Sequence, residues 1–132
     1  MMSDRAQACF AKFQGNVELA ARIEEKLPDD QAWSCVVRFY AAVHLMNTYL
    51  IDKSQVRFDP ASTEHTERKK TMDRCPELRD APRRYRHLKD ISESVRYDAG
   101  FRYTEEHHRD VKTNLDRIIA IVEPKIRRTR PG

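Results

Sequence analysis

The sequence predicts an all-α fold, a bundle of four to five helices that run up and down beside one another. Apolar residues recur every three to four positions along four long segments, which is the spacing of buried helix faces. Glycine occurs only 3 times in 132 residues, too rarely for the tight turns of an all-β chain. We therefore expect residues 1–126 to form one helical domain and residues 127–132 to form a basic, disordered tail.

Charge and cysteine content narrow the possible classes of site. Lysine and arginine number 25 against 21 acids, a net charge of +4, which permits nucleic-acid binding without requiring it. The three cysteines, Cys9, Cys35 and Cys75, form no C-x-x-C pair, so we expect no metal and no cofactor. Cys9 and Cys35 are expected in the core. Without an apolar signal core or a run of about 18 apolar residues, the chain is expected to be cytoplasmic, with no membrane segment.

The first helix is predicted over 4–26. Its apolar residues follow the helical spacing and form one face: Cys9, Phe10, Phe13, Val17, Ala20, Ile23 and Leu27. The Pro-Asp-Asp sequence at 28–30 ends this helix and supplies caps for the next one.

The second helix, over 31–52, is apolar around most of its girth and is expected to be central. One stripe, expected to be buried, contains two polar residues among apolar ones: Trp33, Val37, Tyr40, His44, Asn47 and Ile51. A narrow polar edge is expected to face solvent: Ser34, Arg38, Thr48 and Asp52.

Three further elements complete the bundle. A loop over 53–61 leads to a short helix that Ser62 or Thr63 caps and that reaches residue 72. A further helix over 78–95 adjusts at Pro82. After a turn at 98–100, Thr104 caps the last helix, whose apolar face is Val111, Leu115, Ile118, Ile119, Val122 and Ile126.

Arg102 and His107 are separated by four residues around the start of the last helix. The N–H groups and dipole of a helix N-terminus attract a phosphate, which an arginine can hold and neutralise. A histidine can move a proton to or from a 2′-hydroxyl or a leaving 5′-oxygen. This spacing indicates a metal-free site for RNA cleavage. The alternative is a loop arginine beside an exposed histidine. His107 and His108 point about 100° apart on a helix, so they are not expected to share a metal ion.

A second polar cluster is expected around the central helix. His44 and Asn47 lie within its apolar stripe, and other polar residues of the later segments could join them: His65, Arg68, Arg96 and Tyr97. One interpretation is a nucleotide or small-ligand pocket. The other is a buried, hydrogen-bonded pair that sets the helix register, with surface salt bridges around it.

The helix over 78–95 has a strongly basic outer face. Four of its side chains are the expected contacts to an RNA backbone: Arg83, Arg84, Arg86 and Lys89. Binding through such contacts weakens steeply with salt. A solvated helical surface is the alternative.

Three motifs between residues 30 and 122 resemble small stand-alone bacterial HEPN-like proteins. They are Trp33-x2-Val36-x2-Phe39-Tyr40-Ala41-Ala42-x-His44, then Ser/Thr-x-x-His65-x-x-Arg68, then Tyr85-x2-Leu88-x3-Ser92-x3-Arg96-Tyr97. The resemblance implies a four- or five-helix bundle that is commonly dimeric. Many HEPN-like proteins are metal-independent ribonucleases of toxin–antitoxin or defence systems.

The resemblance also implies roles for two residues. Its ribonucleases use an Arg-x4–6-His motif near the start of a late helix, with two copies meeting across a dimer. Arg102 and His107 match this motif, so Arg102 would bind the scissile phosphate and His107 would act as acid and base. Tyr103 stands where active members usually carry a polar residue. Other members have lost catalysis and act as binding or partner domains, including partners of nucleotidyltransferases.

Two hypotheses for function follow from the sequence. The first is a HEPN-like homodimer that binds RNA and cleaves it through Arg102 and His107. The second is a non-catalytic HEPN-like module that binds a nucleotide or pairs with itself or with an enzyme partner.

Overall fold

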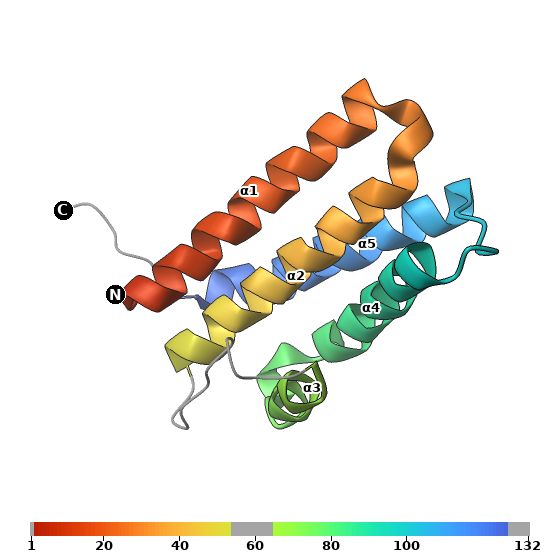
Figure 1. The fold of residues 1–132 in the computed structure, drawn as a ribbon. Coiled ribbons are helices and arrows are strands. Elements are labelled where there is room, and N and C mark those ends of the chain that lie inside the picture. The colour runs from red at the N-terminus through yellow and green to blue at the C-terminus, as the bar shows by residue number, and fades with distance from the viewer. Residues whose placement is uncertain (1, 54–64, 127–132) are drawn as a thin grey trace.

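The computed structural model describes residues 2–53 and 65–126, and every regular element in these ranges is helical (Figure 1). The α-helices of these ranges are α1 (Asp4–Lys26), α2 (Gln31–Lys53), α3 (His65–Asp73), α4 (Ala81–Tyr97) and α5 (Glu105–Val122). Short 3-10 helices span Pro28–Asp30, Pro76–Leu78 and Glu123–Lys125. The prediction of an all-α bundle is confirmed for the described residues.

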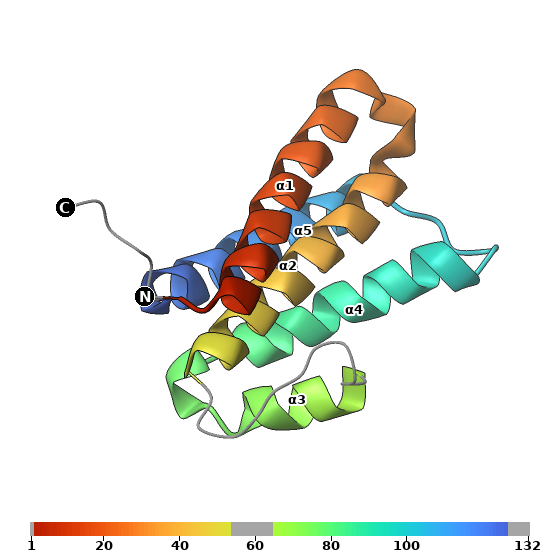
Figure 2. The same ribbon diagram turned by 60° about the vertical axis from the view of Figure 1, so that its left-hand side comes forward.

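The four long helices lie side by side and alternate in direction. Following the colour from red to blue, α1 runs away from the N-terminus, α2 returns, α4 runs out again and α5 returns (Figures 1 and 2). The short α3 lies across one end of this group, below α4 in Figure 2. The turn between α1 and α2 and the loop before α5 lie at the opposite end, and there they position the site described below.

Local signals set most helix ends. The Ser3 side chain accepts a hydrogen bond from the backbone N–H of Ala6 at 3.2 Å, and α1 covers the predicted range 4–26. The predicted start of α4 at residue 78 is wrong. Leu78 ends a 3-10 helix, and Arg79 takes a positive φ of 55°, a conformation that breaks the helix. The α-helix begins at Ala81, with Pro82 in its first turn, where a missing N–H costs little.

The core forms where α2 meets the other long helices. Most of its large, fully buried side chains come from α2, α4 and α5, and Met72 of α3 and Leu78 join them: Phe39, Leu45, Met46, Leu50, Tyr85, Leu88, Val111 and Ile118. The rings of Phe39 and Tyr85 pack with their centroids 5.6 Å apart. The expectation that α2 is central is confirmed by this burial.

The two faces of α2 are not divided as predicted. Trp33 is 57% exposed and Tyr40 is 37% exposed, although both belong to the stripe expected to be buried. The predicted polar edge is buried instead: Ser34, Arg38, Thr48 and Asp52. Its polar groups find partners inside the fold, because Arg38 bonds to Ser34 and to Glu24 of α1, and Thr48 bonds to the carbonyl of His44.

Smaller differences concern single apolar residues. Cys35 is buried as predicted, whereas Cys9 is half-buried and Leu27 is 50% exposed at the turn into α2. On α5, Ile121 is buried and Ile119 lies at the edge of the core. The predicted loop after residue 53, the caps Ser62 and Thr63, and the tail 127–132 lie outside the described residues.

Candidate functional site

A reciprocal cap holds the first turn of α5. Thr104 Oγ1 accepts a hydrogen bond from the His107 backbone N–H at 3.2 Å, and His107 Nδ1 accepts one from the Thr104 backbone N–H at 3.1 Å. This capping box satisfies two backbone N–H groups near the start of the helix. Because Nδ1 is an acceptor, the ring proton of neutral His107 lies on Nε2.

The predicted catalytic pair, Arg102 and His107, lies at this end of α5. Arg102 is exposed on the preceding loop, and His107 is half-buried. The same turn carries Glu105 and Glu106, two exposed carboxylates at the positive end of the helix dipole. These acids already place negative charge where a phosphate would bind. The helix end therefore attracts a phosphate less than the spacing of Arg102 and His107 predicts.

Two aromatic rings contact the imidazole of His107. The Phe101 ring centroid lies 5.0 Å from it, and the Tyr103 centroid lies 6.0 Å from it with the two planes only 24° apart. The orientation of His107 is therefore held by ring contacts as well as by its cap. Through these contacts His107 packs against the loop before α5.

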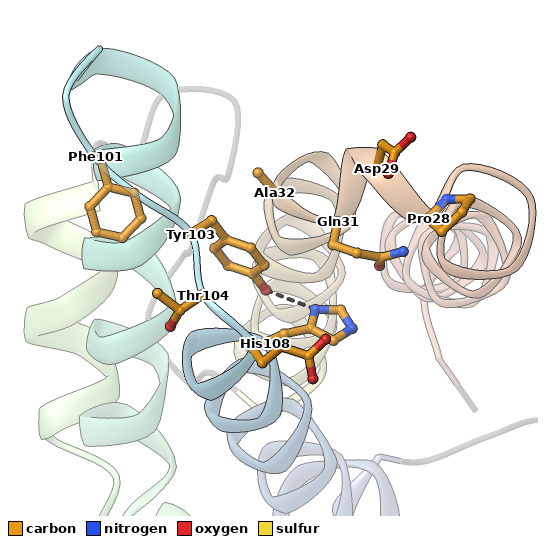
Figure 3. A pocket seen from close by; sticks show the side chains of 9 residues that line it. Pro28, Asp29, Gln31, Ala32, Phe101, Tyr103, Thr104 and His108 are labelled. Carbon is orange, nitrogen blue, oxygen red and sulfur yellow. Dashed lines mark hydrogen bonds between the residues drawn. The ribbon is translucent and has the colours of Figure 1, made fainter.

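A pocket of about 400 Å³ lies beside this loop (Figure 3). Nine residues line it: Pro28, Asp29, Gln31, Ala32, Phe101, Tyr103, Thr104, Glu105 and His108. They come from the α1–α2 turn, the first turn of α2, the loop before α5 and the first turns of α5. The volume lies within the range of small-molecule sites.

A series of polar contacts leads from the pocket into the bundle. Tyr103 Oη lies 2.9 Å from His108 Nδ1, the dashed contact in Figure 3, and His108 Nε2 lies 3.6 Å from a Glu24 carboxylate oxygen. The Glu24 carboxylate also accepts hydrogen bonds from Arg38 and, at 2.7 Å, from Lys112. Glu24 thereby connects α1 to both α2 and α5.

The environment keeps Tyr103 and His108 neutral. The hydrogen bond from Lys112, followed by that from Arg38, lowers the pKa of Glu24 to about 2 against the opposing effect of burial. Burial raises the pKa of the Tyr103 phenol and lowers the pKa of His108. Both shifts oppose proton transfer, so Tyr103 keeps its proton and His108 stays uncharged in their hydrogen bond. The pair is poorly suited to act as nucleophile and base.

Asn47 and Arg68 of the second predicted cluster meet in the interior. Arg68 Nε donates to Asn47 Oδ1 at 2.8 Å, and both residues are buried. His44 is half-buried one turn before Asn47, and burial, followed by the charges of Lys12 and Arg68, lowers its pKa. The hydrogen bond joins α3 to α2. The side chain of His65 lies outside the described part of the chain.

Arg96 and Tyr97 form a different group with Tyr40. Arg96 Nη1 donates to Tyr40 Oη at 3.1 Å, and its guanidinium carbon lies 5.7 Å from the Tyr40 ring centroid and 5.0 Å from that of Tyr97. Tyr97 is 77% exposed. The structure thus divides the predicted cluster into a buried hydrogen bond between α2 and α3 and an exposed aromatic group on α2 and α4.

The four cations expected to contact RNA all face carboxylates. Nitrogen–oxygen distances are short in each pair: Arg83–Asp80 (3.4 Å), Arg84–Asp80 (2.7 Å), Arg86–Asp73 (3.2 Å) and Lys89–Glu93 (2.9 Å). Such pairs offset much of the positive charge that would attract a phosphate backbone. The basic appearance of this segment in the sequence therefore overstates the charge of its surface.

Comparison with known proteins assigns no family. No family model, no curated protein and no solved structure matches the chain. Among residues 2–53 and 65–126, no group of three or more His, Cys, Asp or Glu side chains is arranged to hold a metal ion. The described helices include none with the length and apolar character needed to cross a membrane. The function is therefore inferred from the geometry of the chain itself.

Glu24, Tyr103 and His108 are absent from the predicted site residues. His108 precedes Val111 by three positions and Leu115 by seven, so helical spacing places it on the buried face of α5. That spacing is a usable sequence signal for a histidine that lines the interior. Tyr103 and Glu24 carry no comparable signal, because a loop residue and a residue of α1 meet α5 only through tertiary packing.

Proposed function

We propose that the protein is a HEPN-like helical module that pairs with a second copy of itself and does not cleave RNA. The observation that carries this proposal is the capping box, in which His107 Nδ1 accepts the backbone N–H of Thr104. The residue expected to act as acid and base is thus committed to holding the start of α5.

The chemistry of RNA cleavage conflicts with this cap. A histidine that takes a proton becomes an imidazolium with N–H groups on both ring nitrogens. The Nδ1 proton of His107 would then face the N–H of Thr104, so this hydrogen bond would break, although Thr104 Oγ1, 3.0 Å from Nδ1, is placed to accept the new proton. The hydrogen bond from the His107 backbone N–H to Thr104 Oγ1 does not involve the imidazole and would remain. Each protonation would therefore break the Thr104 N–H···Nδ1 hydrogen bond of the capping box, which argues against His107 as a proton shuttle.

An exposed aromatic surface favours pairing between copies. We define it as Trp33, Tyr40, Arg96 and Tyr97; Trp33 and Tyr40 lie seven positions apart on one face of α2. Aromatic residues and arginine supply most of the binding energy in protein interfaces. In a two-fold dimer one patch meets its own copy, so this single surface would serve both protomers. A homodimer also agrees with the resemblance to HEPN-like proteins.

Sedimentation equilibrium tests the pairing. The wild type is expected at about twice the chain mass of 15.6 kDa, and the double variant Trp33→Ala/Tyr97→Ala at the chain mass. Leu19→Ala is the matched control, because Leu19 is a 39% exposed apolar residue of α1 outside the aromatic surface. A wild type that stays monomeric at every concentration would overturn the proposal, as would equal dissociation by the control variant.

A metal-independent ribonuclease is the second candidate, and one observation favours it. Arg102 is exposed at the same helix end as His107, and no described side chain pairs with its guanidinium. The His107 Nε2–H could donate to a phosphate that Arg102 holds.

Incubation with mixed tRNA and mRNA in excess EDTA separates the two candidates. We expect no cleavage by the wild type at high protein concentration. Cleavage that leaves cyclic-phosphate ends, and that Arg102→Ala and His107→Ala both abolish, would establish the ribonuclease instead. Thr104→Ala is the control for the cap: a catalytic His107 predicts that this variant keeps activity, whereas a purely structural effect predicts equal losses. Arg109→Ala, on α5, controls for the loss of one exposed arginine near the same helix end.

A further inference from the structure

Arg96 lies among the rings of the aromatic surface. Its guanidinium carbon is 5.0 Å from the ring centroid of Tyr97, 5.7 Å from that of Tyr40 and 5.9 Å from that of Phe39. The Phe39 ring is fully buried in the core, whereas Tyr40 and Tyr97 are exposed. Arg96 therefore links a rigid core ring to the two exposed tyrosines.

Hydrogen bonds fix the plane of this guanidinium. Arg96 Nη1 donates to Tyr40 Oη at 3.1 Å, and Tyr97 Oη lies 3.5 Å from the same nitrogen. Arg96 Nε donates to the backbone carbonyl of Ser92, one turn earlier on α4, at 3.3 Å. Because two different nitrogens of one planar group are bonded, the orientation of the group is set as well as its position.

The charge of Arg96 is met by rings and not by an acid. Arg96 forms no ion pair with any described side chain. The negative potential of the ring faces stabilises the cation, and a guanidinium is more weakly hydrated than an ammonium group. Covering Arg96 with a partner therefore costs less than covering a lysine, which agrees with the enrichment of arginine in protein interfaces.

The position of Tyr97 depends on Arg96. Tyr97 is the last residue of α4, and its side chain is 77% exposed. The hydrogen bonds and ring contacts of this side chain within the described residues are all made with Arg96. Ordering an exposed side chain on binding costs conformational entropy, so a contact that orders the ring beforehand favours binding.

We infer that Arg96 is the positioning residue of the aromatic surface: it holds the rings of Tyr40 and Tyr97 in the orientation in which a second copy meets them. The inference rests on the pairing proposed above and names the residue on which its affinity depends. Arginine is required here and not merely a positive charge, because lysine keeps the charge but lacks the planar group that bonds through two separate nitrogens.

Trp33, the single tryptophan of the chain, supplies the readout for pairing. Its side chain is 57% exposed and belongs to the aromatic surface, so its fluorescence should shift to shorter wavelength when pairing covers it. Dilution of the full chain then gives the Kd of the dimer. We expect Arg96→Lys to raise this Kd about tenfold. Arg83→Lys is the matched control, the same exchange on α4 at an arginine outside the aromatic surface, and it should change the Kd less than twofold.

A double-mutant cycle tests the contact itself. Tyr40→Phe keeps the ring and removes the hydroxyl that accepts from Arg96 Nη1. It should raise the Kd about threefold in the wild type and leave it unchanged in Arg96→Lys, where this contact is already lost. A merely structural role of either residue would give additive effects.

Nuclear Overhauser effects test the positioning without a partner. They are recorded between the Arg96 side chain and the Tyr97 ring in Trp33→Ala, a variant in which pairing should be weakened. We expect these effects to be present, because the ring is held within one chain before a second copy arrives.

A tenfold loss confined to Arg96→Lys, with no further loss from Tyr40→Phe, supports the inference. Three results would overturn it: tight pairing of Arg96→Lys, equal weakening by Arg83→Lys, or no Overhauser effect between Arg96 and Tyr97. Any of these, in a wild type that pairs and that Trp33→Ala/Tyr97→Ala dissociates, refutes the role of Arg96 and leaves the pairing intact. A monomeric wild type refutes both, so the two failures are distinguishable.

Discussion

Glu24 is the side chain whose substitution most sharply tests the packing at the end of the bundle that holds the pocket. Its carboxylate accepts hydrogen bonds from Arg38 of α2 and Lys112 of α5 and lies 3.6 Å from His108 Nε2. Arg38 is only 7% exposed, so its charge has little access to water. Glu24→Gln keeps the shape of the side chain, removes its charge and leaves this buried guanidinium without a counter-ion.

The magnitude follows from the pKa of Glu24, which falls from an ordinary value of 4.5 to about 2 in the folded protein. At about 1.4 kcal/mol per pH unit, this difference would correspond to about 3.4 kcal/mol of stability. The Glu24 side chain is 31% exposed, however, and solvent screens part of the interaction. We therefore expect Glu24→Gln to lower the free energy of unfolding by about 2 kcal/mol at pH 7.

The pH dependence has a definite sign. A carboxyl group whose folded pKa is lowered contributes its stability fully above pH 4.5 and loses it as the pH falls toward 2. Urea unfolding followed by circular dichroism, at pH 7 and pH 3, should show the difference between wild type and Glu24→Gln shrinking by more than half. Glu25→Gln is the control, because Glu25 is 74% exposed and contacts only Lys26, at 3.9 Å, in an ion pair. Equal stability of Glu24→Gln and wild type at pH 7, or a difference that persists at pH 3, would refute the reasoning.

Three other substitutions test the core, the buried polar contact and the cap. Phe39→Ala removes a fully buried ring packed on Tyr85 and should cost about 4 kcal/mol in urea unfolding. Asn47→Ala takes the acceptor from the buried Arg68 guanidinium and should cost about 2 kcal/mol, seen as a lower Tm. Thr104→Ala should cost about 1 kcal/mol and speed amide hydrogen exchange in the first turn of α5.

Each of these predictions has a result that contradicts it. A loss of stability below about 1 kcal/mol for Phe39→Ala would contradict the burial of this ring in the core. Trp33→Ala, which truncates an exposed ring, gives the reference value for a substitution at the surface. An unchanged Tm for Asn47→Ala would mean that the Arg68 contact is not part of the folded state. Unchanged amide exchange in Thr104→Ala would mean that the Thr104 cap does not stabilise the first turn of α5. The main argument against a catalytic His107 would then fail.

Helix bounds were predictable where their signals are local. Ser3 and Pro28 flank α1 within a few residues of its ends, and Thr104 lies directly before α5, so spacing and capping rules place both helices. The start of α4 was not predictable in the same way. Arg79 has a positive φ, which arginine does not favour, so no local sequence signal predicts that the α-helix begins only after this residue.

The candidate site was predictable only in part, for a related reason. The position of Arg102 and His107 at the start of α5 follows from chain order. The partner of His107 Nδ1 does not, because histidine is not the glutamate or glutamine that usually completes a capping box. The pocket of Figure 3 was not predicted at all, since its lining residues at 28–32 and at 101–108 are separated by most of the chain.

By itself the sequence determined that the chain is helical, that its second helix is central and where most helices begin and end, because periodicity and capping act over a few residues. Only the tertiary structure decided which face of α2 is covered. Arg38 and Ser34 are polar and look solvent-facing in the sequence, yet α1 brings Glu24 to Arg38, and Arg38 donates to Ser34, so both are buried with partners. Trp33 remains 57% exposed for the converse reason, since no described helix packs over it, and Tyr40 is only partly covered, by Arg96 of α4. Burial depends on the partner that packing supplies, and the sequence of one helix cannot specify that partner.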